Sequence, residues 1–351
     1  QASLCYKKLN MSKKNSNVLN LKKIIFENKK NSEVYSAFKK NILFLKNKKF
    51  VVGVSGGPDS LALVALCRLH QEETKTRVYF VLVDHGIRKN SKKESLSVKK
   101  LLKRKNISLN VIRNDRKINT NIQAKAREVR YRLLSKFCFT KDLKYILTAH
   151  HSDDQIETFL IRLSRGSGVQ GLSSMKMITK TNMNLRIVRP LLNIKKKELV
   201  YLAKKTFGKI FYDPSNRNIK YLRTKIRKLK KSFEKSGIHH DQIIKSINNL
   251  ASSNTTLNNY IDKIYKINVK KENKNICIDL KNLFLETNEI QIKIISKSIK
   301  NFSNSYYPPR SKKILNLINE LKAKKQKKFT LGGCIIERSN KSIIIKKEAK
   351  N

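Results

Sequence analysis

The sequence contains few acidic residues, and this shortage gives the chain a strong positive charge. Its 25 Asp and Glu residues stand against 79 Lys and Arg residues, so the formal net charge is +54 and the sequence pI is about 10.3. An excess of this size predicts a polyanionic partner, and nucleic acid is the first candidate. Lys, Asn and Ile are abundant throughout the chain, so drift in an AT-rich coding sequence is an alternative source of part of the charge.

Paired cysteines and long apolar runs are also missing. The five cysteines stand alone, with no CxxC pair, which argues against a cysteine-ligated metal and fits a reducing cytoplasm. Apolar runs such as VYFVLV at 78–83 are far shorter than the roughly 20 residues of a membrane span. The first 20 residues hold no continuous apolar stretch of the secretory kind. We therefore expect a cytoplasmic protein with no membrane segment.

Short apolar runs alternate with segments of helical spacing in the first half of the chain. The runs lie at residues 50–54, 78–83, 108–112 and 145–148. Continuous apolarity predicts strands covered on both faces, and the alternation with helices predicts right-handed crossovers. The fold class predicted for this half is α/β, a doubly wound parallel sheet.

A chain of 351 residues is long enough for two or more domains, and composition changes suggest their limits. We expect a loose N-terminal segment and helix at 1–47, the doubly wound domain at 48–218, and a basic helical region at 219–300. A small α+β end at 301–351 should contain two short strands around a turn at Ser339 and Asn340.

The unusual residues of the first half follow the predicted strands. Residues 55–60 read SGGPDS after the first strand, Asp84 and His85 follow the second, and His150 and His151 follow the fourth. Because the carboxyl ends of parallel strands meet at one edge of a sheet, these residues should form a single site.

The SGGPDS turn has the chemistry of a phosphate cradle. Gly56 and Gly57 allow a tight turn, Pro58 suits the first helical position, and Ser55 and Ser60 offer hydroxyl groups. A turn between a strand and a helix points backbone N–H groups at an anion. The lysine of a GxxxxGK[ST] loop is absent, which argues against phosphoryl transfer of the usual P-loop kind.

Asp59 is unexpected in such a cradle, because a carboxylate repels phosphate unless a Mg²⁺ ion lies between them. The alternative is an acid favoured by the positive end of a helix. Within SGGPDS we predict that Asp59 is functional and name it as a tentative Mg²⁺ ligand.

The hexamer resembles the pyrophosphate loop, or PP-loop, of N-type ATP pyrophosphatases, and further motifs follow it in order. They are Asp84-His85-Gly86, AREVRY at 126–131, AHHSDDQIET at 149–158, RGSGVQGL at 165–172, RPLL at 189–192 and DPSN at 213–216. This set resembles the tRNA(Ile)-lysidine synthetase family over roughly residues 48–230, with a weaker likeness at TLGGC, 330–334. The resemblance implies the adenine nucleotide alpha hydrolase-like fold.

The resemblance also implies a function. Members of this family use ATP to adenylate C2 of the wobble cytidine in a CAU-anticodon isoleucine tRNA, attach lysine there, and release AMP and pyrophosphate. The implied cofactors are ATP and Mg²⁺, and the implied partners are that tRNA and L-lysine. The basic helices should bind tRNA, and a homodimer is left open.

Carried over position by position, the resemblance gives three groups of site residues. The catalytic group is Asp59, His150, Asp154 and Glu157. The ATP-binding group is Ser55, Gly56, Gly57, Pro58, Asp59, Ser60, Asp84 and His85. The tRNA or adenylate contacts are Arg127, Arg130, Arg165, Arg189, Arg223 and Arg227. One position departs from the family pattern, since Thr224 stands where the family has Asn.

Simpler interpretations exist for several of these residues. The spacing of His150, Asp154 and Glu157 places them on one side of a helix start, where acids and a capping box are ordinary. Capping explains Asp153 but not Glu157, which lies beyond the first turn. The glycines of RGSGVQGL describe a flexible loop, and they also suit a segment that closes over a site. The alternatives for the whole chain are a PP-loop tRNA thiolase and a non-catalytic basic RNA-binding protein.

Overall fold

The computed structural model describes residues 20–87, 90–115, 120, 122–181, 183–212, 222–272, 275–303, 309–323 and 328–348. Within it the chain forms two compact units, residues 1–251 and 252–351. Helix α10, His240–Asn268, supplies residues to both. The predicted DPSN motif at 213–216 lies outside the described residues.

The first unit is built on a six-stranded sheet with the order β3-β2-β1-β4-β6-β5. Its strands are β1 Phe50–Val54, β2 Val78–Asp84, β3 Leu109–Arg113, β4 Tyr145–Leu147, β5 Ile178–Lys180 and β6 Arg186–Val188. All neighbours pair in parallel except β5, which runs antiparallel to β6. The four predicted strands and the parallel α/β class are confirmed, whereas β5 and β6 were not predicted because their sequences, ITK and RIV, are not continuous apolar runs.

The strand order places a topological switch between β1 and β4. After β1 the chain builds outward through β2 and β3, then returns to add β4 on the other side of β1. Ligands of open α/β sheets bind outside the carboxyl ends of strands at such a point. Here those ends lead into SGGPDS and into AHH, so the two predicted motifs are neighbours.

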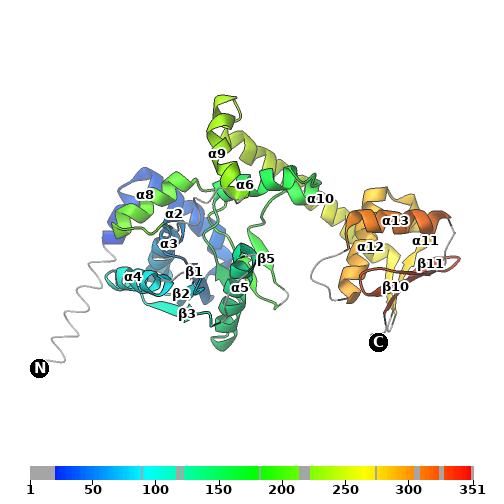
Figure 1. Cartoon of the computed structure of the whole chain (residues 1–351), viewed down its shortest axis with the longest axis horizontal. Coiled ribbons are helices and arrows are strands. Elements are labelled where there is room, and N and C mark those ends of the chain that lie inside the picture. Colours follow the sequence, from blue (N-terminus) through cyan, green and yellow to red (C-terminus); the bar gives the residue numbers. More distant parts are fainter. Residues whose placement is uncertain are drawn as a thin grey trace, which may run out of the picture. The chain divides into compact units, whose positions relative to one another are not determined.

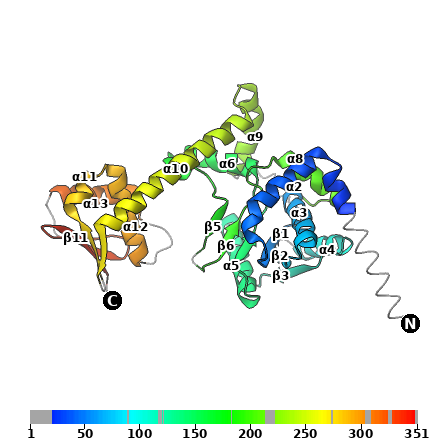
Figure 2. The same ribbon diagram turned by 180° about the vertical axis from the view of Figure 1, so that it is seen from behind.

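Helices cover both faces of this sheet (Figure 1). The helices of this unit are α2 Lys29–Ile42, α3 Pro58–Thr74, α4 Ser91–Lys103, α5 Ile122–Thr140, α6 Ser152–Leu163, α7 Val169–Leu172, α8 Lys196–Phe207 and α9 Leu222–Lys235; of these, α7 and α9 contact α6. Helices α2, α3, α4 and α8 share one buried cluster with Val52 and Val54, and α5 packs with Val51 on the other face. Figure 2 shows α2 and α8 beside α3.

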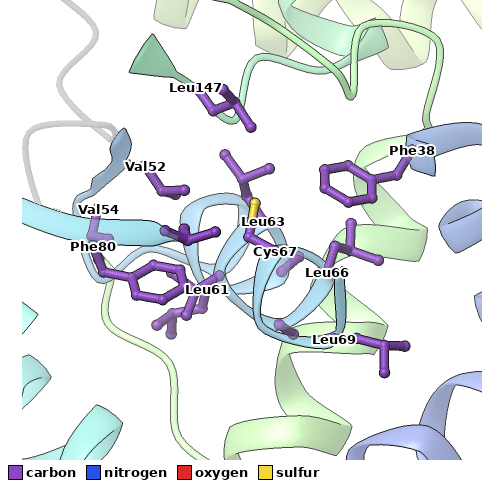
Figure 3. Close-up of a cluster of buried hydrophobic side chains, with 14 of the residues drawn as sticks. Phe38, Val52, Val54, Leu61, Leu63, Leu66, Cys67, Leu69, Phe80 and Leu147 are labelled. Atoms are coloured by element: carbon purple, nitrogen blue, oxygen red, sulfur yellow. The ribbon is translucent and has the colours of Figure 1, made fainter. Parts of the chain in front are cut away.

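Helix α3 lies at the centre of the first cluster. Every residue from Ser60 to His70 is buried, so the helix is apolar almost all round, as expected for one enclosed by protein. Its leucines pack against Phe38, Phe80 and Leu147 (Figure 3). This packing holds the start of α3, and with it the phosphate loop, in place.

The second unit has a five-stranded antiparallel sheet in the order β7-β8-β11-β10-β9. The strands are β7 Val269–Glu272, β8 Asn275–Asp279, β9 Lys328–Thr330, β10 Cys334–Arg338 and β11 Ser342–Lys347, with helices α11 Leu280–Leu285, α12 Asn288–Ser303 and α13 Ser311–Ala323. The predicted hairpin is confirmed as β10 and β11. Its turn lacks glycine because Ser339 closes it, accepting from the Ser342 backbone N–H at 3.1 Å.

The structure differs from the prediction between residues 219 and 300. We expected helices alone there, but β7 and β8 form two strands of the second unit's sheet. In β7 only Val269 is apolar, and the apolar run of β8 is limited to residues 276–278, so neither strand stands out among the basic helices. The compact units also divide at residue 251, not at the predicted limits of 218 and 300.

Two expected absences concern the described residues only. No helix among them is long and apolar enough to cross a membrane. The four cysteines they include, at positions 67, 138, 277 and 334, are free thiols.

Candidate functional site

The phosphate loop follows β1 and is held in a fixed shape. Gly56 has φ +79°, and a Cβ atom there would lie 2.5 Å from Val98 Cγ2, so both conformation and space require glycine. Gly56 also accepts a hydrogen bond from the Phe211 backbone N–H at 3.2 Å. Ser60 donates its hydroxyl to the Gly57 carbonyl at 2.9 Å and accepts from the Ser55 backbone N–H at 3.2 Å. Pro58 begins α3 as predicted.

Asp59 and the start of α6 meet beside this loop. Asp59 Oδ2 lies 3.5 Å from His151 Nε2, and the same nitrogen lies 3.5 Å from Asp154 Oδ2. His151 caps α6, and its backbone N–H donates to Asp154 Oδ2 at 3.1 Å. The residues predicted from two separate motifs therefore form one cluster.

Charges within this cluster stabilise each other. Burial opposes protonation of His151, but the hydrogen bond to Asp59 and the Asp154 and Asp59 charges outweigh burial, so the pKa of His151 is raised from 6.5. Burial opposes ionisation of Asp154, yet the neighbouring histidines, the His151 backbone N–H and Arg223 lower its pKa. The two carboxylates thus favour protonation of the imidazole, and the imidazole favours ionisation of Asp154.

His150 behaves oppositely to His151. Burial lowers the pKa of His150 to about 3; the Asp154 charge opposes this shift, and the charges of Arg189 and Arg127 add to it. Its Nδ1 is 2.9 Å from Thr148 Oγ1. His150 is therefore a neutral hydrogen-bonding group at physiological pH.

Arg189 is the most buried of the predicted arginines, with 6% of its surface exposed. Its Nη1 donates to the Lys176 carbonyl at 2.8 Å and to Thr179 Oγ1 at 2.9 Å, whereas its buried Nε finds no hydrogen-bond partner in the part of the chain that the structure describes. Arg127 lies over the Tyr131 ring at 5.0 Å on α5. Buried polar atoms without partners are uncommon in proteins and fit a site that awaits a ligand.

Glu157 is paired with two arginines of α9. Its Oε1 accepts from Arg227 Nε at 2.5 Å, and its Oε2 accepts from Arg227 Nη2 at 3.1 Å. Arg223 Nε lies 3.0 Å from Oε2, and Arg223 Nη2 donates to Thr158 Oγ1 at 3.3 Å. With 5% of Glu157 exposed, both carboxylate oxygens are already occupied. Arg223 and Arg227 are partly buried and neutralise the Glu157 carboxylate. Thr224, which stands where the family pattern has Asn, is buried, so this difference from the family lies in the interior of the protein.

The remaining predicted residues differ in their distance from the cluster formed by Asp59, His151 and Asp154. Asp84 is buried at the end of β2 and accepts from the Gly86 N–H at 3.0 Å. Burial and the Arg130 charge lower the pKa of His85 to about 4, against the Asp84 charge. Arg165 is exposed beyond the end of α6, and within the described chain no hydrogen bond or ion pair joins it to the cluster.

RGSGVQGL is more ordered than a flexible loop. Its second half forms the short helix α7, and Arg162 Nη1 donates to the Gly171 and Ser174 carbonyls at 2.7 and 2.9 Å. A role in closing over the site stays a prediction.

The sequence did not single out a second ionic cluster at the start of α6. Asp153 lies 3.0 Å from Lys230 Nζ on α9 and 3.3 Å from His240 Nε2 at the start of α10. His240 Nε2 is also 3.2 Å from Ser152 Oγ. The spacing of residues within α6 does not reveal this contact. The signal that could have indicated it is the opposite charge of Asp153 and of the distant residues Lys230 and His240.

A cavity of about 180 Å³ lies beside this second cluster, between α6, α9 and the start of α10. Its walls combine apolar side chains with charged ones: Asp153, Ile156, Glu157, Leu160, Lys196, Ile226, Arg227, Lys230, Phe233, Glu234, Ile238, His240 and Ile243. Glu157 and Arg227 belong both to these walls and to the surroundings of the Asp59 cluster, since the Asp154 and Asp59 charges act on Arg227.

The donor set can be tested for a divalent cation. Among the described residues no three His, Cys, Asp or Glu side chains gather into a metal site. Among the described residues, however, Asp59 Oδ1 is buried without a hydrogen-bond partner. Mg²⁺ binds one or two protein carboxylates and completes its coordination shell with phosphates and water. A carboxylate oxygen beside a phosphate cradle therefore suits this ion. Asp59 therefore fits a Mg²⁺ ion that arrives bound to a nucleotide, and not an ion coordinated by protein side chains alone.

Comparisons with known proteins agree with this geometry. The PP-loop domain family, ATP_bind_3, matches residues 27–232. A tRNA(Ile)-lysidine synthase of Wolbachia pipientis wMel is 34% identical over 308 residues, covering 86% of this chain and 71% of that protein. One from Orientia tsutsugamushi is 34% identical over 316 residues, covering 87% and 71%, and one from Rickettsia typhi is 33% identical over 328 residues, covering 90% and 74%.

A solved structure shares the fold. The U34-tRNA thiolase NcsA from Methanococcus maripaludis superposes with a TM-score of 0.53 at 18% identity, covering 63% of this chain and 78% of that one. At that identity the likeness concerns the fold alone, so it does not favour the thiolase alternative. The ordered motifs, the loop that leads to Asp59 and the extended similarity together show that the chain belongs to the tRNA(Ile)-lysidine synthase family of PP-loop enzymes.

Proposed function

We propose that this protein is a ligase that joins lysine to C2 of the wobble cytidine in a CAU-anticodon isoleucine tRNA. The C2 oxygen attacks the α-phosphorus of ATP and pyrophosphate leaves. The ε-amine of lysine then attacks C2, the C2–O bond breaks, and AMP departs with that oxygen while the amine loses a proton. The observation that carries the proposal is the meeting of Asp59, His151 and Asp154 outside the carboxyl ends of β1 and β4.

The phosphate loop supplies the site for ATP. Backbone N–H groups at the start of α3 and the positive end of that helix attract the phosphates. Asp59 would hold a Mg²⁺ ion, which would neutralise the charge that develops on the departing pyrophosphate. Arg189 and Arg127 near His150 add fixed positive charge for the adenylate.

Lysine presents a protonation problem that the acids address. Its side-chain pKa is about 10.4, so about one molecule in a thousand carries a free amine at neutral pH. Asp154 attracts the ammonium and orients it. Neither His150 nor Asp154 is basic enough to retain a proton at neutral pH, because the pKa of each is lowered, so their role is orientation while water accepts the proton.

The cavity between α6, α9 and α10 fits the lysine side chain. Apolar walls such as Ile156, Leu160 and Ile226 suit four methylene groups, and charged groups on the same walls suit the polar ends. Glu157 would exchange an arginine for the α-ammonium group of lysine, because lysine binding at this carboxylate must displace part of the existing pair.

The tRNA would meet the basic helices. Helix α9 exposes Lys225, Lys228 and Lys230 in a chain whose net charge is +54. Such lysines contact phosphates and provide affinity more than sequence discrimination. We place the reaction in the cytoplasm, in keeping with the free cysteines.

One assay tests the proposal. The protein is incubated with ATP, Mg²⁺, radiolabelled lysine and CAU-anticodon isoleucine tRNA, with methionine tRNA as the control. We expect label in the isoleucine tRNA together with AMP and pyrophosphate. Release of pyrophosphate without lysine incorporation would favour another PP-loop modification, and no ATP turnover with intact tRNA binding would favour a non-catalytic RNA-binding protein.

A further inference from the structure

One buried imidazole is shared by two carboxylates from distant parts of the chain. His151 is 2% exposed, and its Nε2 is equally far, 3.5 Å, from Asp59 Oδ2 on α3 and from Asp154 Oδ2 on α6. His151 follows the fourth predicted strand, but it belongs neither to the predicted ATP-binding group nor to the predicted catalytic group. Its place between these groups is the observation from which the inference starts.

The backbone of His151 is fixed at the sheet edge. It forms a parallel bridge with Leu191, and the next residue, Ser152, donates its N–H to the Ile194 carbonyl at 3.0 Å. Asp154 is tied to the same point, because its Oδ2 accepts from the His151 backbone N–H at 3.1 Å. If the phosphate loop shifts, the imidazole therefore stays with Asp154 and does not follow Asp59.

A single N–H cannot serve both carboxylates well. The Nε2 atom carries one hydrogen, and both distances exceed the usual N–H···O distance of about 2.9 Å. Among the described residues, meanwhile, Asp59 Oδ1 is buried without a hydrogen-bond partner, so Asp59 has the most to gain from a new ligand. Once Asp59 takes that ligand, the imidazole N–H is left to Asp154 alone.

We infer that His151 is a positioning residue that couples occupation of the phosphate loop to the placement of the Asp154 carboxylate. A loaded loop draws Asp59 away from the shared N–H, and His151 then holds Asp154 firmly. This links the nucleotide side of the site with the side that orients the amine. The inference rests on the proposed function only in requiring that ATP binds at the loop.

A double-mutant cycle on ATP affinity tests the coupling without tRNA or lysine. The Kd for ATP with Mg²⁺ is measured by calorimetry for the full chain, for Asp154→Asn, for His151→Leu and for the double variant. Any direct effect of the lost Asp154 charge on ATP occurs in both backgrounds and cancels in the cycle. We expect the factor by which Asp154→Asn changes Kd to differ about fivefold between the two backgrounds.

Asp153→Asn is the matched control. It removes the same charge from the adjacent position of the same helix turn, but Asp153 is paired with Lys230 and His240 instead. The His151 charge also acts on Asp153, though no contact joins the two side chains among the described residues, so its cycle with His151→Leu should give a factor well below fivefold. A factor for Asp154 no larger than the factor for Asp153 would overturn the inference.

His151→Gln separates the shared N–H from packing, because its amide restores an N–H donor. The coupling should persist in this variant, and its loss there would assign the effect to packing and contradict the inference. Thermal unfolding checks that each variant folds; if His151→Leu does not, His151→Ala replaces it, since it also removes the donor. Failure of the unaltered chain to bind ATP would contradict the proposed function, whereas binding with a factor near one would contradict the coupling alone.

Discussion

The two units of the molecule bury different kinds of residue. Among the described residues, the first unit buries charged side chains, including Arg68, Asp84, His151, Glu157 and Arg189. The buried polar side chains described in the second unit are Asn254, Asn268, Gln291 and Ser298, and none is charged. Buried charges are costly unless they are paired or used. The contrast indicates that the chemistry belongs to the first unit and that isoleucine packing stabilises the second.

The strongest test of this contrast changes one acid in each unit. Asp59→Asn should lower the rate of pyrophosphate release by about a hundredfold or more, because it removes the carboxylate beside the phosphates. Asp262→Asn is the control in the second unit, where Asp262 pairs with Lys297 at the surface. Equal effects of the two changes on the rate would remove the distinction between the units.

A core substitution in the second unit should alter stability but not ATP binding. Ile294 is fully buried in the isoleucine cluster, so Ile294→Ala should reduce the free energy of unfolding by about 2–5 kcal/mol. The loss is measured by chemical denaturation of the full chain. The Kd for ATP at a temperature where the variant is folded should stay unchanged; a weaker Kd would show that the loop depends on the second unit.

Filling the cavity should affect lysine more than ATP. Leu160→Trp places a larger side chain among its walls, and we expect the KM for lysine to rise about tenfold while the Kd for ATP stays the same. Leu229→Trp is the control, because Leu229 is an exposed residue of α9 outside the cavity walls. An unaltered KM in the cavity variant would show that lysine binds elsewhere.

The smallest expected effect is a pH dependence of stability. The folded pKa of His150 is lowered to about 3 from 6.5, so between these values the unfolded chain binds a proton that the folded chain does not. Its contribution to stability is therefore present above about pH 6.5 and is lost as the pH falls.

Comparison of the chain with His150→Gln isolates this contribution. Between about pH 6 and pH 4 the variant should lose stability less steeply, by at most about 1.4 kcal/mol per pH unit. Urea denaturation at a series of pH values measures the two slopes. Parallel slopes would mean that His150 titrates normally in the folded protein.

The sequence was sufficient for four of the six strands of the first sheet and for the meeting of SGGPDS with AHH, because both depend on local patterns. The apolar runs predicted β1 to β4, and residues at their ends predicted the meeting of SGGPDS with AHH. Pairing between distant segments was beyond it. The spacing of Glu157 on α6 gave no sign that Arg223 and Arg227 would occupy its oxygens, and β7 and β8 contain at most three consecutive apolar residues. Such features depend on which surfaces meet, and that is decided by tertiary packing.

The contacts of Gly56 affect the rate and the affinity of nucleotide binding. Val98 on α4 and Phe211 beyond α8 both lie against the loop at Gly56, although they are 42 and 155 positions further along the chain. The loop is thus ordered before the nucleotide binds. The conformational entropy cost of ordering it is part of folding and not part of nucleotide binding. The Val98 side chain is apolar and cannot bind a phosphate. Substitutions at Val98 should nevertheless lower the affinity for ATP, because they alter a contact that orders the loop.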